Sequence, residues 1–135
     1  MTHRVAVVTG ASSGIGKETA KALAAQGWHV IALGRDPSRT VAAEAEIRAA
    51  ATGQVDMIRA DLSLIAEAER AADAIAALTS RIDILINNAG GMASRMVMTS
   101  EGLEQNFAGN HLGPFVLTNR LLPLLRAAAA DAPAV

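Results

Sequence analysis

The sequence predicts an α/β fold built on a doubly wound parallel sheet. Short apolar runs alternate with longer stretches of helical periodicity, a pattern that gives parallel strands joined by right-handed crossovers. A glycine-rich turn at residues 9–16 (TGASSGIG) separates the first apolar run from the first helical stretch. The chain is 51% hydrophobic and 19% charged, so it can bury a core, and we expect one domain over residues 1–135.

The expected elements alternate along the chain. The four strands are the apolar runs at residues 5–8, 28–33, 55–60 and 82–87. The last of these is typical of a strand that is buried on both faces. Helices are expected at about residues 14–26, 37–51 and 64–79, and a mainly helical stretch at about 100–130.

Polar residues suited to helix caps precede the first three helices. Ser12 or Ser13 is expected to cap the first helix. Asp36 is expected to cap the second, with Pro37 at its first position, where a missing N–H costs nothing. Ser63 is the expected cap of the third helix.

The doubly wound connection places the strands in the order 3-2-1-4. Pro114 and Pro123 should bend the last helical stretch. Residues 131–135 (DAPAV) resemble a loop that leads toward a fifth strand, which the sequence does not contain. The fourth strand should therefore be an open edge that pairs with another chain, as in a homo-oligomer, or with a missing segment.

Composition argues against several classes of function. The formal net charge is −1 with no basic patch, so nucleic acid is not an expected partner. There is no cysteine, and the three histidines lie far apart, so neither a disulfide nor a metal site is expected. No apolar stretch reaches the roughly 20 residues of a membrane span. The N-terminus runs directly into a strand without a signal peptide, so a cytoplasmic protein is expected.

The glycine-rich turn predicts a nucleotide-binding site. Its glycines, Gly10, Gly14 and Gly16, have the spacing Gly-x-x-x-Gly-x-Gly. Glycines let the backbone approach a pyrophosphate, and the N–H groups at the start of the next helix point toward it. A turn with only a structural role would also use glycine, but the position between a strand and a helix favours nucleotide binding.

The end of the second strand should select the cofactor. An acidic residue about 20 positions beyond the motif usually binds a ribose 2′-hydroxyl, but Gly34 and Arg35 occupy this place. Gly34 leaves room for a 2′-phosphate and Arg35 could bind it, so NADP(H) is favoured over NAD(H). Arg35 could instead be a solvated surface residue, and the Asp36 carboxylate would repel a phosphate unless it only caps the helix. Arg39 could add a second positive charge.

Two further segments follow strand ends. The Asp61 carboxylate could accept a hydrogen bond from an adenine amine, or it could cap the next helix. Residues 87–90 (NNAG) combine small and amide side chains, which fit the ligand crevice at the carboxyl end of a central parallel strand. An ordinary turn would also use Asn and Gly.

Together these motifs resemble the short-chain dehydrogenase/reductase family. The motifs are residues 9–16, Asp61-Leu62, residues 87–90 and residues 110–115 (NHLGPF), and the resemblance runs from Arg4 to about Leu125. The stretch 110–125 is most similar to the retinol dehydrogenase and protochlorophyllide reductase branch. The resemblance implies the N-terminal part of a Rossmann-type enzyme. Such an enzyme transfers hydride reversibly between the nicotinamide and a small-molecule carbonyl or alcohol, often as a dimer or tetramer.

The resemblance also implies roles for individual residues. The pyrophosphate and its ribose would be surrounded by Gly10, Ser12, Ser13, Gly14, Ile15 and Gly16. Arg35 would meet the 2′-phosphate, while the adenine would contact Asp61 and Leu62. The rest of the cofactor cleft would be lined by Asn88, Ala89 and Gly90.

The catalytic set of the family is represented here only by Asn110. In the family this Asn helps to hold a water in a proton relay, although Asn110 could simply satisfy helix backbone groups. The family's Ser and Tyr-x-x-x-Lys have no counterpart, and the sequence contains no tyrosine. Two alternatives therefore stand beside the enzyme: a non-catalytic dinucleotide-binding or interaction module, and a truncated product.

Overall fold

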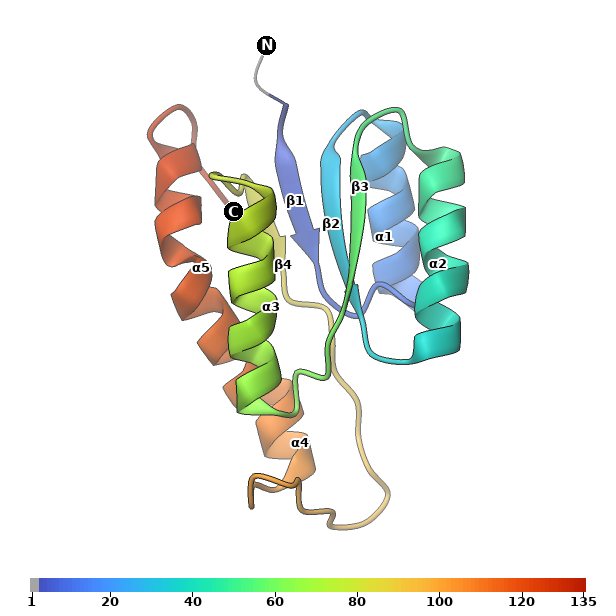
Figure 1. Cartoon of the computed structure of the whole chain (residues 1–135), viewed down its shortest axis with the longest axis vertical. Helices are drawn as coiled ribbons and strands as arrows, with labels where there is room; N and C mark the ends of the chain where they lie inside the picture. Colours follow the sequence, from blue (N-terminus) through green and yellow to red (C-terminus); the bar gives the residue numbers. More distant parts are fainter. Residues whose placement is uncertain (1–2) are drawn as a thin grey trace.

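The computed structural model describes residues 3–135 and contains one parallel sheet (Figure 1). Its order is β3-β2-β1-β4, as predicted. The strands are β1 (Val5–Val8), β2 (His29–Gly34), β3 (Val55–Arg59) and β4 (Ile84–Ile86). The helices are α1 (Gly14–Ala25), α2 (Pro37–Ala50), α3 (Ile65–Leu78), the short α4 (Gln105–Phe107) and α5 (Gly113–Ala129), with a π-helical turn, η1 (Ala108–Leu112), before α5.

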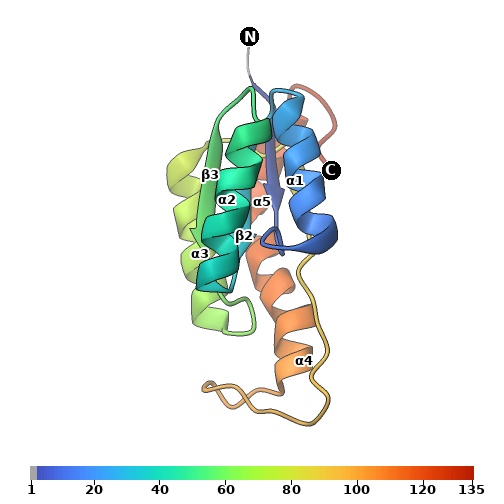
Figure 2. The same ribbon diagram turned by 90° about the vertical axis from the view of Figure 1, so that its right-hand side faces the viewer.

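The sheet is the middle of three layers. Helices α1 and α2 cover one face, and α3 and α5 cover the other (Figures 1 and 2). A hydrophobic core lies on each face of the sheet, and successive side chains of β1 point into one core and then the other. Val7 packs with Leu117 and Leu121 of α5, and Val8 packs with Ala20 of α1. All of β1 is buried, so the loop that follows it is anchored in the centre of the molecule.

Two of the predicted helix caps are corrected by the structure. Asp36 does cap α2, because its Oδ1 accepts from Arg39 N at 2.8 Å. Ser13 occupies the cap position of α1, but within residues 3–135 neither its side chain nor that of Ser12 makes a capping hydrogen bond. Ser63 does not cap α3, which begins at Ile65.

The start of α3 is capped instead from a distant loop. Glu101 accepts from Ile65 N at 2.5 Å and from Ala66 N at 3.1 Å, through its two carboxylate oxygens. Ser63 donates its N–H and its hydroxyl to Asp61 Oδ1, at 3.0 and 2.7 Å, so neither Asp61 nor Ser63 is the side chain at the helix start. A cap that comes from 35 residues away leaves no local sequence pattern.

The outer edge of β4 differs from the prediction. The strand is shorter than residues 82–87 and half-buried, because within residues 3–135 its only partner strand is β1. Val135 N donates to Asp83 O at 2.8 Å, and Leu85 N donates to Val135 O at 2.6 Å. This is the pattern of a parallel ladder around Ile84. The edge is therefore covered at this point by the chain's own last residue, and pairing with a second chain stays a prediction.

The helical stretch at 100–130 begins later than predicted. A loop with an antiparallel bridge between Met98 and Glu104 precedes α4. Pro114 lies in the first turn of α5 and Pro123 lies inside that helix. Over residues 3–135, no helix combines the length and the apolarity needed to cross a bilayer.

Candidate functional site

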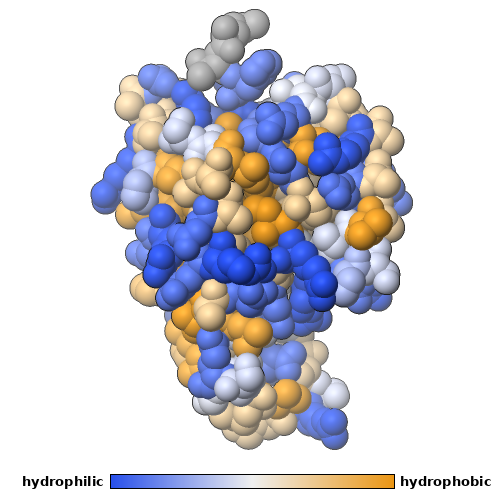
Figure 3. All heavy atoms as spheres, viewed as in Figure 1, coloured by the Kyte–Doolittle hydropathy of each residue, from blue (hydrophilic) through white to orange (hydrophobic). Residues whose placement is uncertain are grey.

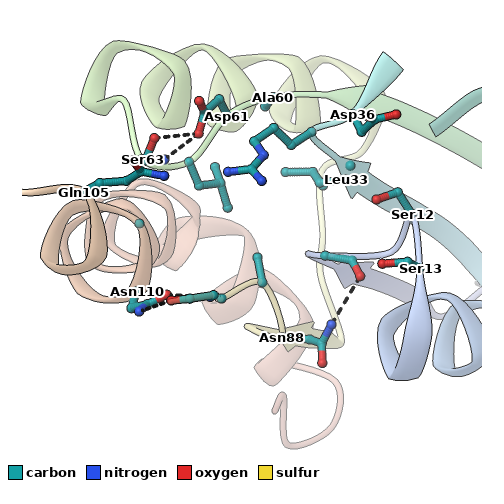
Figure 4. A pocket seen from close by; sticks show the side chains of 18 of the residues that line it. Ser12, Ser13, Leu33, Asp36, Ala60, Asp61, Ser63, Asn88, Gln105 and Asn110 are labelled. Atoms are coloured by element: carbon teal, nitrogen blue, oxygen red, sulfur yellow. Dashed lines mark hydrogen bonds between the residues drawn. The ribbon is translucent and has the colours of Figure 1, made fainter. Parts of the chain in front are cut away.

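A cleft of about 480 Å³ lies at the carboxyl ends of the four strands (Figure 4). The loops after β1, β2, β3 and β4 all contribute to it, and α4 and η1 close one side. In the space-filling view, hydrophilic residues form a band across the middle of the molecule (Figure 3). Ligands bind at this end of open α/β sheets, because the loops there diverge and leave a crevice.

Each of the three positions in the motif requires glycine for a different structural reason. Gly10 has a φ of +64°, and a Cβ there would lie 2.8 Å from Ala89 Cα, so only glycine lets the loop pack against the end of β4. A Cβ on Gly16 would collide with Gly10 O and with the Asn88 amide. Gly14 has a φ of +57°, but a Cβ there would meet nothing within 4 Å. The space beside Gly14 is therefore open to an approaching ligand.

The glycine loop is tied to the end of β4 by Thr9. Its buried hydroxyl accepts from Asn88 N at 3.0 Å and from Ala89 N at 2.9 Å. Asn88 Nδ2 in turn donates to Thr9 O at 3.2 Å and to Gly10 O at 3.3 Å. Figure 4 shows Asn88 beside the glycine loop. The Asn88 amide N–H groups thus hold the loop in place. No role for Thr9 was predicted from the sequence, although a hydroxyl directly before the first glycine was the available signal.

The end of β2 carries positive charge into the cleft. Gly34, Arg35, Asp36 and Arg39 all line it. Asp36 uses its carboxylate to cap α2, as predicted. Among residues 3–135, neither the Arg35 nor the Arg39 guanidinium has a carboxylate partner within ion-pair distance. Two cations without fixed partners beside a glycine suit a phosphate.

The opposite wall is formed by the segment after β3. Asp61 and Leu62 line the cleft there, and Asp61 and Ser63 lie across it from Ser12 and Ser13 (Figure 4). The Asp61 carboxylate is oriented by its two hydrogen bonds from Ser63. A Cβ on Gly113 would collide with Leu62 O, so that glycine lets α5 pack directly against this wall.

Asn110 fixes the loop that follows β4. From η1, its Oδ1 accepts from Gly91 N at 3.0 Å and its Nδ2 donates to Gly91 O at 2.7 Å. Asn106, one helical turn earlier, holds the same loop by accepting from Ala93 N at 2.9 Å. The alternative that Asn110 bonds to helix backbone groups is therefore wrong, because the backbone groups that it bonds to belong to Gly91 in the loop. Asn106 was missed by the sequence analysis, although the four-residue spacing was visible.

The structure thus brings together most of the predicted site. Of the predicted residues, the cleft is lined by Gly10, Ser12, Ser13, Arg35, Asp36, Asp61, Leu62, Asn88, Ala89, Gly90 and Asn110. Gly14, Ile15 and Gly16 lie outside this lining; Gly16 is buried, whereas Ile15 is 81% exposed. His111 stacks between Phe107 and Phe115, at ring distances of 5.4 and 6.3 Å. Residues 3–135 contain no group of three side chains that could hold a metal ion.

Sequence comparison identifies relatives with the same motifs. A family model for short chain dehydrogenases matches residues 4–131. Human retinol dehydrogenase 13 is 41% identical over 127 residues, which are 93% of this chain and 38% of the relative. Mouse retinol dehydrogenase 12 is 42% identical, with 93% and 40% covered, and TIC 32 A of Brassica napus is 35% identical, with 96% and 41% covered. The chain therefore spans about two fifths of these curated relatives.

Solved structures of about twice the length share the fold. The Pseudomonas aeruginosa RhlG/NADP active-site complex has a TM-score of 0.82 and 36% identity, with 99% of this chain and 53% of that chain covered. The NADH-dependent reductase A1-R′ complexed with NAD has a TM-score of 0.80 and 29% identity, with 98% and 57% covered. The retinol dehydrogenases agree with the predicted branch. With a matching family model, a sheet order of β3-β2-β1-β4 and a glycine-lined cleft at its carboxyl end, this chain belongs to the short-chain dehydrogenase family.

Proposed function

We propose that the cleft binds NADP(H) and that the whole protein is an oxidoreductase acting on a small-molecule carbonyl or alcohol. The observation that carries the choice of NADP(H) is the end of β2. Arg35 and Arg39 line the cleft there without carboxylate partners among residues 3–135, and the neighbouring Gly34 places no side chain in the cleft. The Asp36 carboxylate, which would otherwise repel a phosphate, is engaged by the start of α2.

The residues present fit a dinucleotide. The N–H groups at the start of α1 and the open side of Gly14 suit a pyrophosphate, whose negative charge the helix N-terminus stabilises. Arg35 and Arg39 would hold the 2′-phosphate, and Asp61 and Leu62 would contact the adenine. When bound, the nicotinamide supplies the group that gives or accepts hydride.

Related structures support the class of cofactor. RhlG and a metagenomic short-chain oxidoreductase were solved with NADP, and the reductase A1-R′ was solved with NAD. The family is thus dependent on NAD or NADP. The preference of this chain for the phosphorylated form rests on Arg35 and Arg39.

Hydride transfer also needs a proton donor beside the carbonyl. Asn110 is the candidate catalytic residue in this chain, and its present contacts hold the backbone of Gly91 at the cleft wall. The sequence contains no tyrosine to act as the acid. We therefore assign the proton donor to a further segment of the protein or to a second, different chain. We also propose that the protein is cytoplasmic and forms a homo-oligomer.

A titration of the 135-residue chain with NADPH and NADH tests the binding proposal. Isothermal titration calorimetry should give a dissociation constant at least about tenfold lower for NADPH, as expected for a charge-assisted hydrogen bond to the phosphate. Equal affinities would remove the argument from Arg35 and Arg39, and the absence of any binding would reject the proposal.

The intact mass of the protein from its native cell tests the enzyme proposal. A mass well above 13.9 kDa, together with NADPH-dependent carbonyl reduction, is expected. A mass near 13.9 kDa with tight NADPH binding and no turnover would instead support the non-catalytic dinucleotide-binding module.

A further inference from the structure

Thr40 lies directly behind the end of β2. It belongs to the first turn of α2, where its N–H donates to Asp36 O at 2.9 Å, and it is 6% exposed. Its hydroxyl oxygen is buried and has no hydrogen-bond partner among residues 3–135. A buried hydroxyl without a partner is destabilising, and few such groups occur in native structures. Local stability therefore does not explain why a threonine is present at position 40.

The hydroxyl occupies the space that a side chain on Gly34 would need. A Cβ added to Gly34 would lie 2.6 Å from Thr40 Oγ1 and 2.9 Å from Ser12 Cβ. Both distances are shorter than real Cβ atoms show, so one of the neighbours would have to move. The φ of Gly34 is not in the left-handed region, so space, rather than backbone conformation, restricts this position.

Position 34 is important because of what a side chain there would do to a ligand. Gly34, Ser12 and Arg35 line the same part of the cleft. In dinucleotide-binding sheets, a carboxylate at the end of the second strand binds the ribose 2′-hydroxyl, whereas an arginine accommodates a 2′-phosphate. A residue that keeps position 34 without a side chain also keeps a carboxylate away from the phosphate.

We infer that Thr40 restricts position 34 to glycine and so protects the preference for NADP(H) through Gly34, without touching the ligand. The inference rests on the proposed NADP(H) function and names a residue that limits how the preference can be changed. It has a specific consequence: Gly34→Asp alone does not convert the site to NAD(H), because Thr40 has to become smaller at the same time.

Thermal melting tests the packing step without any cofactor. Gly34→Ala should lower the melting temperature, and adding Thr40→Ala should restore a large part of the loss; the contact with Ser12 keeps the restoration incomplete. Thr40→Val is the matched control, because it removes the hydroxyl but fills the same space. If Thr40→Val restores Gly34→Ala as well as Thr40→Ala does, or if Gly34→Ala melts like the unmodified chain, the inference is wrong.

Titration with both dinucleotides tests the consequence. Relative to Gly34→Asp alone, Gly34→Asp with Thr40→Ala should shift the ratio of NADH to NADPH affinity toward NADH by about tenfold or more. Thr40→Ala by itself should keep the NADPH preference, because Gly34 is still present. If Gly34→Asp does not fold alone, the double variant is compared with the unmodified chain, and an unchanged preference would contradict the inference.

The failure of the inference and that of the proposed function give different results. If the unmodified chain binds neither dinucleotide, the proposed function and the specificity role fail together, while the melting data still report the packing of Thr40 against position 34. If the unmodified chain prefers NADPH and Gly34→Asp alone reverses that preference, only the role of Thr40 is rejected.

Discussion

The two ends of the parallel sheet treat charge in opposite ways. At the amino end, Arg81 pairs with Asp83 and with Asp131, each at 2.7 Å. His29 Nε2 lies 2.7 Å from Asp56 Oδ2 at the same end. At the carboxyl end, Arg35 and Arg39 line the cleft and, over residues 3–135, have no carboxylate partner.

This difference separates groups that stabilise the fold from groups that are available to a ligand. Asp83 also accepts from Val5 N at 2.9 Å, so the amino-end network joins β1, β4 and the segment after α5. Its charges are satisfied by fixed partners. Charges left without partners in a cleft, next to glycines that open the backbone, are suited to binding. Substitutions at the amino end should therefore change stability, and substitutions at the carboxyl end should change NADPH affinity.

Asp83→Ala should have the largest effect, and the effect should be on stability. It leaves Arg81 without its close partner and the Val5 N–H without its acceptor, which should lower the free energy of unfolding by about 2–3 kcal/mol. Urea denaturation measures this, and NADPH affinity of the folded protein should not change. Asp73→Ala is the control, because Asp73 is mainly exposed and 4.0 Å from Arg120, and it should change stability by less than about 1 kcal/mol. Equal losses in both variants would contradict the comparison.

Arg35→Ala should affect binding and leave stability unchanged. Losing a charge-assisted hydrogen bond to the 2′-phosphate should weaken NADPH binding by roughly 10- to 100-fold and leave NADH binding nearly the same. Arg126→Ala, at an exposed arginine of α5 outside the cleft, is the matched control. Calorimetric titration distinguishes the outcomes, and equal losses for NADPH and NADH would remove the argument from the 2′-phosphate.

Gly14→Val should affect both measurements moderately. The left-handed φ of +57° should cost about 1–2 kcal/mol of stability for a residue with a Cβ. The new side chain would project into open space, where no protein atom lies within 4 Å, so any loss of affinity reflects obstruction of the ligand. Unchanged NADPH affinity would mean that the loop is only structural.

The smallest expected effect is a pH dependence of stability from the amino end. Burial alone would raise the pKa of the Asp83 carboxyl, but hydrogen bonds from Arg81 and Val5 N outweigh it and hold that pKa below its usual value. A lowered pKa in the folded state stabilises the fold above the unfolded pKa of about 4, and this contribution is lost as the pH falls below that value. Urea denaturation between pH 6 and about pH 3 should show that the free energy of unfolding falls more steeply for the unmodified chain than for Asp83→Asn. Parallel curves would show that Asp83 contributes no such dependence.

The sequence by itself determined the fold and the segments that form the cleft. Strand and helix patterns are local, and the crossover rule then restricts the order of the strands. The turn at residues 9–16 and the residues after each strand were therefore predictable as neighbours. The composition also showed directly that this sequence contains no tyrosine.

Only the tertiary structure decided which polar groups pair with each other. Glu101 caps α3, Thr9 and Asn88 join the glycine loop to β4, and Asn110 holds Gly91. The unpartnered hydroxyl of Thr40 is visible only once α2 is packed behind Gly34. Most of these contacts join residues far apart in the sequence, and all of them depend on differences in position of a few tenths of an ångström. A local pattern carries no information on such distances, because they are set by how the layers pack.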